Sequence, residues 1–391
     1  MNWNISIADS TAPTESPLSD IPLSAFRFSA DGLPAMAENM RVFRGADGNP
    51  FLAPRGVWLA NNKLIVADTG QNRVFIWNKI PDTELAEPDV VLGQLETNDT
   101  GRNAGAGATA STLQYPSGLW SDGQKLIVAD PWNHRVLIWH TFPTRHAQPA
   151  DVVLGQPHFE ANLPNVEGIG TPPSAQSLNW PYGVFSDGVR LWVADTGNRR
   201  VLFFDQIPTQ NHCAASGVVG KPNFVERDYE NHEPIWPYSV RVSANGQMAV
   251  ADTQYYRTLI WNDWQTAFTQ NADVIVGQPD FETNGQNQYS LFPKQNTLSW
   301  TYDAFFYQNG LFVTDTGNSR LLWFNTVPTQ NSAFADNLIG HASFSTSSEN
   351  ANTRNSTDKQ LYWPFSICVA NGGLAVADTG NHRIILLDLI T

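Results

Sequence analysis

Cysteine is scarce in this chain: there are two, Cys213 and Cys368, among 391 residues. Small secreted domains that depend on disulfides carry many more, so a disulfide scaffold is excluded and two unpaired thiols are expected. Long apolar runs are also lacking. No stretch approaches the roughly 18–20 consecutive apolar residues of a membrane-spanning helix, so no such helix is predicted.

Basic residues are in the minority. The chain has 23 lysines and arginines against 37 aspartates and glutamates, which gives a formal net charge of −14. Attraction to phosphate supplies most of the affinity for nucleic acid, and anionic membrane surfaces attract basic segments, so neither partner is expected. The first 20 residues lack the basic start and apolar centre of a signal peptide. The sequence thus predicts a cytoplasmic protein, expected to be a monomer.

What the chain has in quantity is repetition. Residues 180–204, WPYGVFSDGVRLWVADTGNRRVLFF, contain three apolar runs separated by Ser-Asp-Gly and Asp-Thr-Gly-Asn turns. This pattern is typical of a three-stranded antiparallel meander. One meander cannot bury both of its faces, whereas stacked copies can. Six copies occur, and they begin at Ala53, Tyr115, Trp180, Trp236, Trp300 and Trp363.

A short fourth apolar segment, such as residues 89–94, follows five of the six copies, and the sequence ends directly after the third run of the last copy. The sixth such strand is expected from residues 40–45, so that an N-terminal strand pairs in the last blade and no long edge stays free. The sequence therefore predicts an all-β fold, a six-bladed β-propeller of four-stranded antiparallel blades over residues 40–391. An N-terminal arm is expected over residues 1–39.

The segments Asp-Thr-Gly-Asn-His-Arg at 378–383 and Asn-His-Arg-Val-Leu at 133–137 resemble NHL repeats. The resemblance extends from about residue 40 to the C-terminus and implies a propeller, while the family includes protein-binding modules, RNA-binding modules and a few enzymes. Peptidyl-hydroxyglycine amidating lyases are similar in fold and place zinc-binding histidines directly after the proline of the repeat. No histidine stands there in this chain, which argues against such a lyase. The residues at that position are Arg55, Ser117, Tyr182, Tyr238, Tyr302 and Phe365.

Features that repeat without variation indicate architecture rather than a site. In every copy the turn aspartate precedes an arginine by five residues, as Asp195 precedes Arg200, so the arginine can reach back to the carboxylate. A single site requires asymmetry, so the candidates are positions that differ between copies. These positions lie on either side of the proline (threonine in one copy) that begins each first strand.

The differing positions are expected to ring the mouth of the central channel, on the rim that carries the aspartate turns and the long connections between blades. Two interpretations stay open: the aromatic side chains pack the channel shut, or they line a pocket for a planar, sugar-like or cationic group. Asp303 and Arg55 break the symmetry of the ring. The candidate ligand-binding residues are Arg55, Tyr115, Ser117, Trp180, Tyr182, Trp236, Tyr238, Trp300, Tyr302, Asp303, Trp363 and Phe365.

The leading prediction is a non-catalytic propeller that binds a protein or a small ligand through this rim. The alternative is an enzyme of the six-bladed lyase or strictosidine-synthase-like type, with Asp303 as base and Arg55 or a tyrosine as electrostatic partner. No cofactor and no metal site are predicted, because the eight histidines lack metal-ligand spacing. A structural calcium among the acidic loops stays open.

Overall fold

The structure is a computed structural model that describes residues 3–5, 26–28, 40–226, 235–352, 360–370 and 373–388. The chain falls into two compact units. One unit comprises Arg44–Val240 with Gln265–Gln270, and the other comprises Met1–Phe43, Arg241–Trp264 and Asn271–Thr391.

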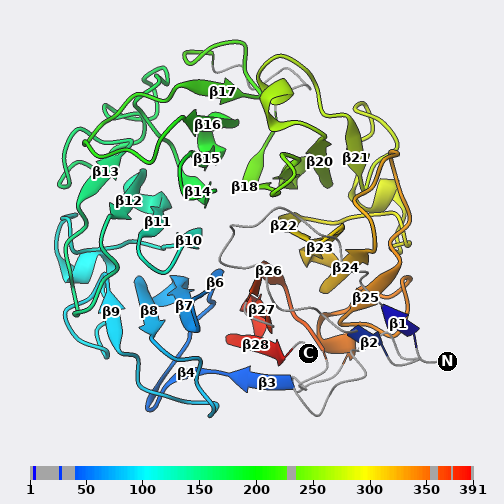
Figure 1. The fold of residues 1–391 in the computed structure, drawn as a ribbon, viewed down its shortest axis with the longest axis horizontal. Helices are drawn as coiled ribbons and strands as arrows, with labels where there is room; N and C mark the ends of the chain where they lie inside the picture. Colours follow the sequence, from blue (N-terminus) through cyan, green and yellow to red (C-terminus); the bar gives the residue numbers. More distant parts are fainter. Residues whose placement is uncertain are drawn as a thin grey trace. The chain divides into compact units, whose positions relative to one another are not determined.

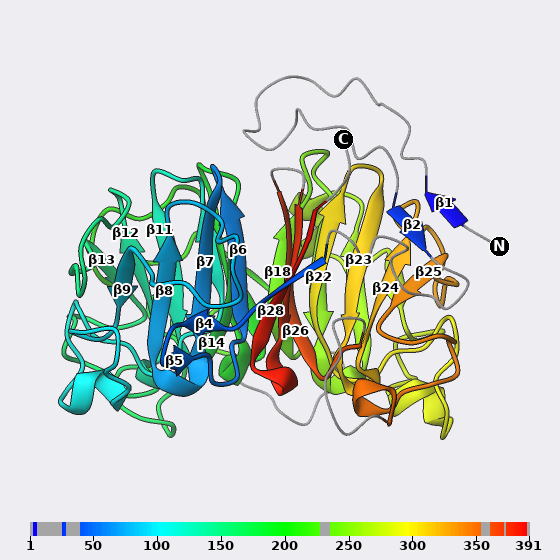
Figure 2. The same cartoon turned by 90° about the horizontal axis from the view of Figure 1, so that it is seen from below.

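The fold is a six-bladed β-propeller, and each blade is a four-stranded sheet (Figure 1). In five blades the strands lie side by side in chain order, as β6, β7 and β8 do in Figure 2. The first blade consists of β6 (Gly56–Ala60), β7 (Lys63–Asp68), β8 (Arg73–Trp77) and β9 (Val90–Leu92). The second consists of β10 (Leu119–Ser121), β11 (Leu126–Asp130), β12 (Arg135–Trp139) and β13 (Val152–Leu154). The third consists of β14 (Pro181–Ser186), β15 (Leu191–Asp195), β16 (Arg200–Phe204) and β17 (Gly217–Val219). The next two consist of β18 (Pro237–Val242), β19 (Met248–Asp252), β20 (Arg257–Trp261) and β21 (Val274–Val276); and β22 (Thr301–Tyr307), β23 (Gly310–Asp315), β24 (Arg320–Phe324) and β25 (Asn337–Ile339).

The sixth blade combines segments from near both ends of the sequence. Its strands are β26 (Pro364–Ala370), β27 (Gly373–Asp378), β28 (Arg383–Asp388) and β3 (Met40–Phe43). Strand β3 pairs antiparallel with β28, with Phe43 opposite Ile384 and Met40 opposite Leu387. The prediction that an N-terminal strand completes the last blade is confirmed.

Each blade has two chemically different ends. The hairpin between its first two strands marks one, called here the hairpin end, and the turn between its second and third strands marks the other, the aspartate-turn end. In every such turn the aspartate closes the second strand, a single turn of 3-10 helix follows, and the arginine opens the third strand. The short helices are η2 (Thr69–Gln71), η4 (Pro131–Asn133), η5 (Thr196–Asn198), η6 (Thr253–Tyr255), η9 (Thr316–Asn318) and η11 (Thr379–Asn381).

The aspartate and the arginine of each turn form a buried ion pair, as the five-residue spacing predicts. Carboxylate Oδ2 and guanidinium Nε lie 2.7 or 2.8 Å apart in all six, with both side chains at most 1% exposed. Burial raises the pKa of Asp68 to about 6, although the Arg73 guanidinium and the Leu52 amide oppose the shift. The pairs are Asp68–Arg73, Asp130–Arg135, Asp195–Arg200, Asp252–Arg257, Asp315–Arg320 and Asp378–Arg383.

The third strands β8, β12, β16, β20 and β24 are buried along their whole length, because each has a strand on both sides and side chains packed on both faces. Apolar side chains of neighbouring blades share one core. In the unit that contains Asn271–Thr391, Ile260 and Val274 from one blade pack with Leu311, Val313 and Leu322 from the next.

Two pairs of short strands lie outside the blades. Strand β1 (Trp3–Ile5) pairs with β2 (Phe26–Phe28), and β4 (Gly45–Ala46) pairs with β5 (Asn49–Pro50). The assignment of residues 1–39 to an arm stays a prediction. Within the described residues, no helix has the length and apolar character needed to span a bilayer. The remaining short helices are η3 (Arg102–Gly105), η7 (Trp264–Phe268), η8 (Gln286–Tyr289) and η10 (Glu349–Asn352).

A corner after the fourth strand repeats in several blades. Gln94, Gln156 and Gln278 each follow a glycine with φ between 87 and 95° and donate Nε2–H to a carbonyl oxygen of the aspartate turn in the same blade, at 3.0–3.2 Å. In the fifth blade His341 takes this place, and its Nε2 lies 3.0 Å from the Asn318 carbonyl oxygen. Burial and the nearby Arg320 guanidinium lower the pKa of His341 to about 4.

This histidine is expected to make stability depend on pH. In the unfolded chain His341 takes up a proton near pH 6.5, whereas in the folded protein it does so only near pH 4. The contribution of His341 to the free energy of unfolding is therefore complete above pH 6.5 and is lost as the pH falls toward 4. His341→Gln supplies the donor used in three other blades and does not titrate. Between pH 7.5 and 4.5 the wild type should lose about 2–3 kcal/mol more unfolding free energy than the variant, measured by urea denaturation. Parallel pH profiles for the two proteins would contradict this role.

Candidate functional site

The first strands of neighbouring blades approach closely where they begin. In the unit Arg44–Val240, a Cβ at Gly118 would lie 2.6 Å from the Tyr182 carbonyl oxygen, so glycine is needed there. The Gly118 amide donates to that oxygen at 2.9 Å, and the Ser117 hydroxyl donates to it at 2.7 Å. Ser117, a candidate site residue, is therefore 6% exposed and engaged in joining two blades.

Asp303 occupies the equivalent of this glycine position in β22, within the other unit, and it too joins blades. Its Oδ2 accepts hydrogen bonds from Arg241 Nη2 at 2.9 Å and from the Ser366 hydroxyl and the Ile367 amide at 3.2 Å each. Its Oδ1 accepts from the Ala304 amide at 3.0 Å. Asp303 is 2% exposed, so its carboxylate ties β22 to β18 and β26.

The aromatic residues that follow the proline or threonine position pair with one another inside each unit. Tyr182 and Tyr238 stack with ring centroids 4.7 Å apart and planes 19° apart. Tyr302 and Phe365 lie with centroids 4.1 Å apart and planes 33° apart. These contacts fit the packing interpretation of this ring. A common mouth formed by both units stays a prediction.

The residues directly before that position, called here the leading residues, share an unusual backbone. Their φ lies between 49 and 56° in five copies: Ala53, Tyr115, Trp180, Trp300 and Trp363. This left-handed conformation costs a non-glycine residue roughly 1–2 kcal/mol. The preceding blade holds two of them in place, because the Tyr115 amide donates to Asn72 Oδ1 and the Trp180 amide to His134 Nδ1, both at 3.1 Å.

His134 is neutral at physiological pH. Burial lowers its pKa to about 4, although a hydrogen bond with Asn179 opposes the shift. Because Nδ1 accepts the Trp180 amide proton, the neutral ring is the form that holds Trp180. The His134 and Trp180 rings lie 5.9 Å apart.

The aspartate turn of the second blade departs from the repeat at two adjacent residues, Pro131 and Trp132, where four other copies have threonine and glycine. In the first blade the threonine, Thr69, donates its hydroxyl to the Pro116 carbonyl oxygen of the next blade at 2.7 Å, which Pro131 cannot do. In the four Thr-Gly copies, the amide of the turn glycine donates a hydrogen bond of 2.7–2.9 Å to the carbonyl oxygen of the residue just before the leading residue. Gly197 bonds to Asn179 in this way. Among the described residues Trp132 makes no such bond to Gln114. The turn therefore lacks two hydrogen bonds that other blades have.

Trp132 places an indole between two leading residues. Its ring centroid lies 5.2 Å from that of Tyr115, with planes 34° apart, and 6.4 Å from that of Trp180, with planes 47° apart. Trp132 is 42% exposed and Trp180 38%. Tyr115, Trp132 and Trp180 together are called here the aromatic surface, which lies at the aspartate-turn ends of the second and third blades.

Tyr182 lies close to Trp132 and to Arg55. Burial raises the pKa of Tyr182, and the nearby Arg55 guanidinium and Trp132 indole oppose that shift. Tyr182 is therefore protonated at neutral pH.

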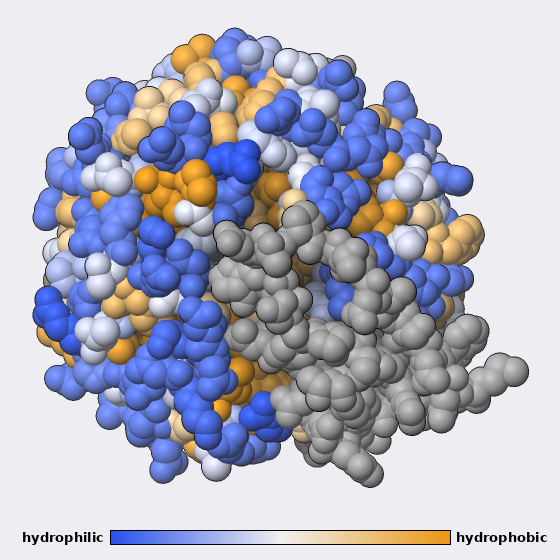
Figure 3. Space-filling model, viewed as in Figure 1, coloured by the Kyte–Doolittle hydropathy of each residue, from blue (hydrophilic) through white to orange (hydrophobic). Residues whose placement is uncertain are grey.

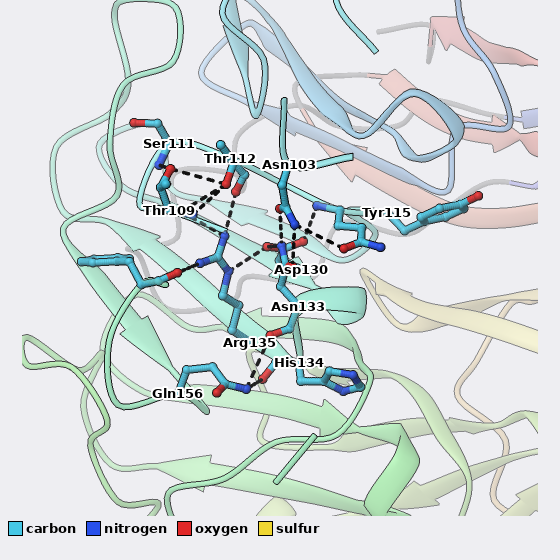
Figure 4. A network of polar contacts seen from close by, with 12 residues as sticks. Asn103, Thr109, Ser111, Thr112, Tyr115, Asp130, Asn133, His134, Arg135 and Gln156 are labelled. Carbon is cyan, nitrogen blue, oxygen red and sulfur yellow. Dashed lines mark hydrogen bonds and ion pairs between the residues drawn. The ribbon is translucent and has the colours of Figure 1, made fainter. Parts of the chain in front are cut away.

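Two long connections border the aromatic surface, and paired asparagines fix them. Asn103 and Asn133 exchange side-chain hydrogen bonds of 3.0 and 2.7 Å (Figure 4). Asn165 and Asn198 exchange bonds of 3.2 and 2.8 Å. Arg102, next to Asn103, places its guanidinium 5.7 Å from the Tyr115 ring centroid. The connections are thus tied to the aspartate turns of the second and third blades.

Other features of the described residues are weaker candidates for a functional site. No three histidine, cysteine, aspartate or glutamate side chains converge there, and neither cysteine forms a disulfide. An open depression of about 280 Å³ lies at the hairpin ends of the second and third blades, with Lys125, His140 and Val189 in its wall. His140 already binds the Pro208 carbonyl oxygen at 3.0 Å. Figure 3 shows hydrophobic residues in small groups among hydrophilic ones on the face that it draws.

No protein-family model matches the chain. Curated proteins similar to it include NHL repeat-containing protein 2 of Bos taurus, 22% identical over 385 residues, and that of Homo sapiens, 22% identical over 379 residues. Each comparison covers 88% of this chain and 47% of the relative, so the chain spans about half the length of the curated relatives it matches. The chain is a six-bladed β-propeller that resembles NHL-repeat proteins. The resemblance seen in the sequence is confirmed.

Solved structures similar to this propeller include Kuenenia stuttgartiensis hydrazine synthase, with 10% identity and a TM-score of 0.49, and a streptogramin B lyase, with 11% identity and a TM-score of 0.45. The first comparison covers 86% of this chain and 96% of the other, and the second covers 89% and 96%. Similarities of this size indicate nothing about function.

The sequence did not lead us to two residues whose contacts set them apart in the structure, Trp132 and Arg241. Trp132 could have been found from Pro-Trp standing where four other copies have Thr-Gly. Arg241 could have been found as the one basic residue inside any first strand, where other copies have Trp58, Trp120, Phe185, Phe305 and Cys368.

Proposed function

We propose that this NHL-repeat propeller is a non-catalytic binding module whose partner docks on the aromatic surface of Tyr115, Trp132 and Trp180. The observation that carries the proposal is the turn of Pro131 and Trp132, which lacks two hydrogen bonds of the repeat and exposes an indole. Departures from the local rules of a fold are expected at functional sites.

The chemistry of the surface supports a binding role. Tyrosine and tryptophan are enriched at the centres of interfaces because they combine a large rigid apolar area with a polar group. The left-handed backbone at Tyr115 and Trp180 and the hydrogen bonds that their amides donate to the preceding blade hold these rings in place before a partner arrives. Such preorganisation reduces the entropy lost on binding.

The catalytic alternative finds less support. A general base must come within hydrogen-bond reach of a substrate proton. The Asp303 carboxylate already accepts bonds from Arg241, Ser366, Ile367 and Ala304, and the residue is 2% exposed. This environment suits a structural ion pair better than a proton acceptor.

The double variant Pro131→Thr/Trp132→Gly tests the proposal, because it installs the Thr-Gly of the other blades. We expect it to be as stable as the wild type, or more stable by about 1–2 kcal/mol, since two hydrogen bonds become possible. Labelled wild-type protein would be applied to arrays of synthetic peptides and of oligosaccharides. Array ligands of the wild type should bind the double variant at least about tenfold more weakly, a loss of 1.4 kcal/mol.

Leu291→Ser serves as the matched control, since it removes an apolar side chain that is 85% exposed elsewhere on the protein. It should leave the array pattern unchanged. If every ligand of the wild type binds the double variant with the same affinity, the aromatic surface is not the docking site.

A further inference from the structure

We infer that the partner is a positively charged protein segment that presents an arginine side chain to the aromatic surface, where the guanidinium stacks on the Trp180 indole. The inference rests on the proposed function and names the ligand class of the same site.

The repeat itself shows how this fold covers a leading residue. Each short helix of an aspartate turn ends at a residue with a left-handed backbone, called here the closing residue. In the third blade the closing residue is Arg199, and its guanidinium lies 4.2 Å from the ring centroid of the next leading residue, Trp236. Tryptophan is the side chain whose ring attracts a cation most strongly, and arginine is the cation found over it most often.

The equivalent place beside Trp180 holds no cation. The closing residue there is His134, whose ring lies 5.9 Å from that of Trp180 and is neutral at physiological pH. The other ring beside Trp180, that of Trp132, is uncharged as well. Within the part of the chain that the structure describes, no lysine or arginine lies over Trp180. Trp180 is 38% exposed and Trp236 less so.

The other end of the aromatic surface already has a cation, because the Arg102 guanidinium lies 5.7 Å from the Tyr115 ring centroid. The rings of Tyr115 and Trp132 touch, with centroids 5.2 Å apart, so a ligand meets their outer faces and does not enter between them. A flat guanidinium needs only one open ring face. Trp180 is therefore the member of the surface that is left to take a cation from outside.

Charge in the bordering connections also favours a cation. The connections that lead to Tyr115 and Trp180, residues 93–114 and 155–179, contain four exposed carboxylates against one arginine, and the second contains no lysine or arginine. In a chain of net charge −14, a basic segment is attracted from a distance, and the indole then adds a contact at short range. The four acidic residues are Glu96, Asp99, Glu160 and Glu167.

The probe is a short peptide of glycine and serine that carries a pair of arginines. A matched peptide carries citrulline, which has nearly the same shape and no charge, in place of both. Binding to the full chain would be measured by isothermal titration at physiological salt. We expect saturable binding of the arginine peptide and at least about tenfold weaker binding of the citrulline peptide.

Trp180→Leu should weaken binding of the arginine peptide about three- to tenfold, because it removes the indole face. Trp363→Leu is the matched control. Trp363 is a leading residue that is 44% exposed, and its connection, residues 340–362, has as many basic as acidic residues. This variant should bind the arginine peptide as the wild type does.

His134→Arg leaves Trp180 in place and installs the arrangement of Arg199 and Trp236. The new guanidinium should cover Trp180 and compete with the arginine peptide, so binding should weaken several-fold. His134→Asn is the control, since it supplies the acceptor that Asn72 provides to the Tyr115 amide and adds no charge. It should bind the peptide as the wild type does, and the denaturation midpoints show whether both variants are folded.

Three outcomes would overturn the inference: equal affinity for the arginine and citrulline peptides, binding that neither Trp180→Leu nor His134→Arg weakens, and equal losses in Trp180→Leu and Trp363→Leu. If an array ligand without arginine depends on Trp132 while the arginine peptide does not bind, the ligand class is wrong and the docking surface stands. If no ligand of any class depends on Trp132, the proposed function fails as well.

Discussion

Asp303→Ser is expected to lower the free energy of unfolding by about 3–5 kcal/mol, because it leaves the Arg241 guanidinium buried without its carboxylate. Arg241 is 6% exposed and lies 2.9 Å from Asp303. Serine is the residue that two other copies carry at this position, at Ser239 and Ser366, so the cost comes from the charge that stays behind and not from the shape of serine. Chemical denaturation followed by tryptophan fluorescence measures the loss.

The double variant Arg241→Phe/Asp303→Ser is the control. Phenylalanine stands at the Arg241 position in two other copies, and replacing a buried ion pair by apolar packing is often neutral or stabilising. We expect most of the lost stability to return. If Asp303→Ser alone proves neutral, the carboxylate does not hold these blades together, and Asp303 should then be tested as a catalytic base.

Arg135→Met should destabilise the protein by a similar amount, about 3–5 kcal/mol. The Arg135 guanidinium donates to Asp130, to the carbonyl oxygens of Thr109 and Thr112 at 3.0 and 2.8 Å, and to that of Phe159 (Figure 4). Its loss leaves buried acceptors unsatisfied and removes the charge that opposes the burial-raised pKa of Asp130. The shift in denaturation midpoint reports the effect.

Arg190→Met is the matched control for this substitution. Arg190 lies 2.7 Å from Asp187 at a hairpin end, and both side chains are partly exposed. Exposed pairs contribute about 0–1 kcal/mol, so this variant should stay close to the wild type. Equal losses in the two variants would show that burial does not set the strength of the repeat ion pairs.

The candidate site was predictable only in part. Tyr115 and Trp180 are recognisable because their positions vary between copies, and the structure does bring them together. The same reasoning placed Asp303 among ligand-binding residues, where the structure shows a carboxylate held by three strands. Sequence comparison between copies identifies a position that differs, but it does not say whether the new side chain faces solvent or a neighbouring blade.

The sequence by itself determined the number of blades, the six aspartate–arginine pairs and the strand that closes the last blade. Those features follow from alternation within a strand and from spacing of a few residues, both of which are local. Only the tertiary structure decided that Trp132 bridges Tyr115 and Trp180 and that Arg241 neutralises Asp303. Arg241 and Asp303 are 62 positions apart along the chain, and these residues meet because neighbouring blades place their first strands side by side.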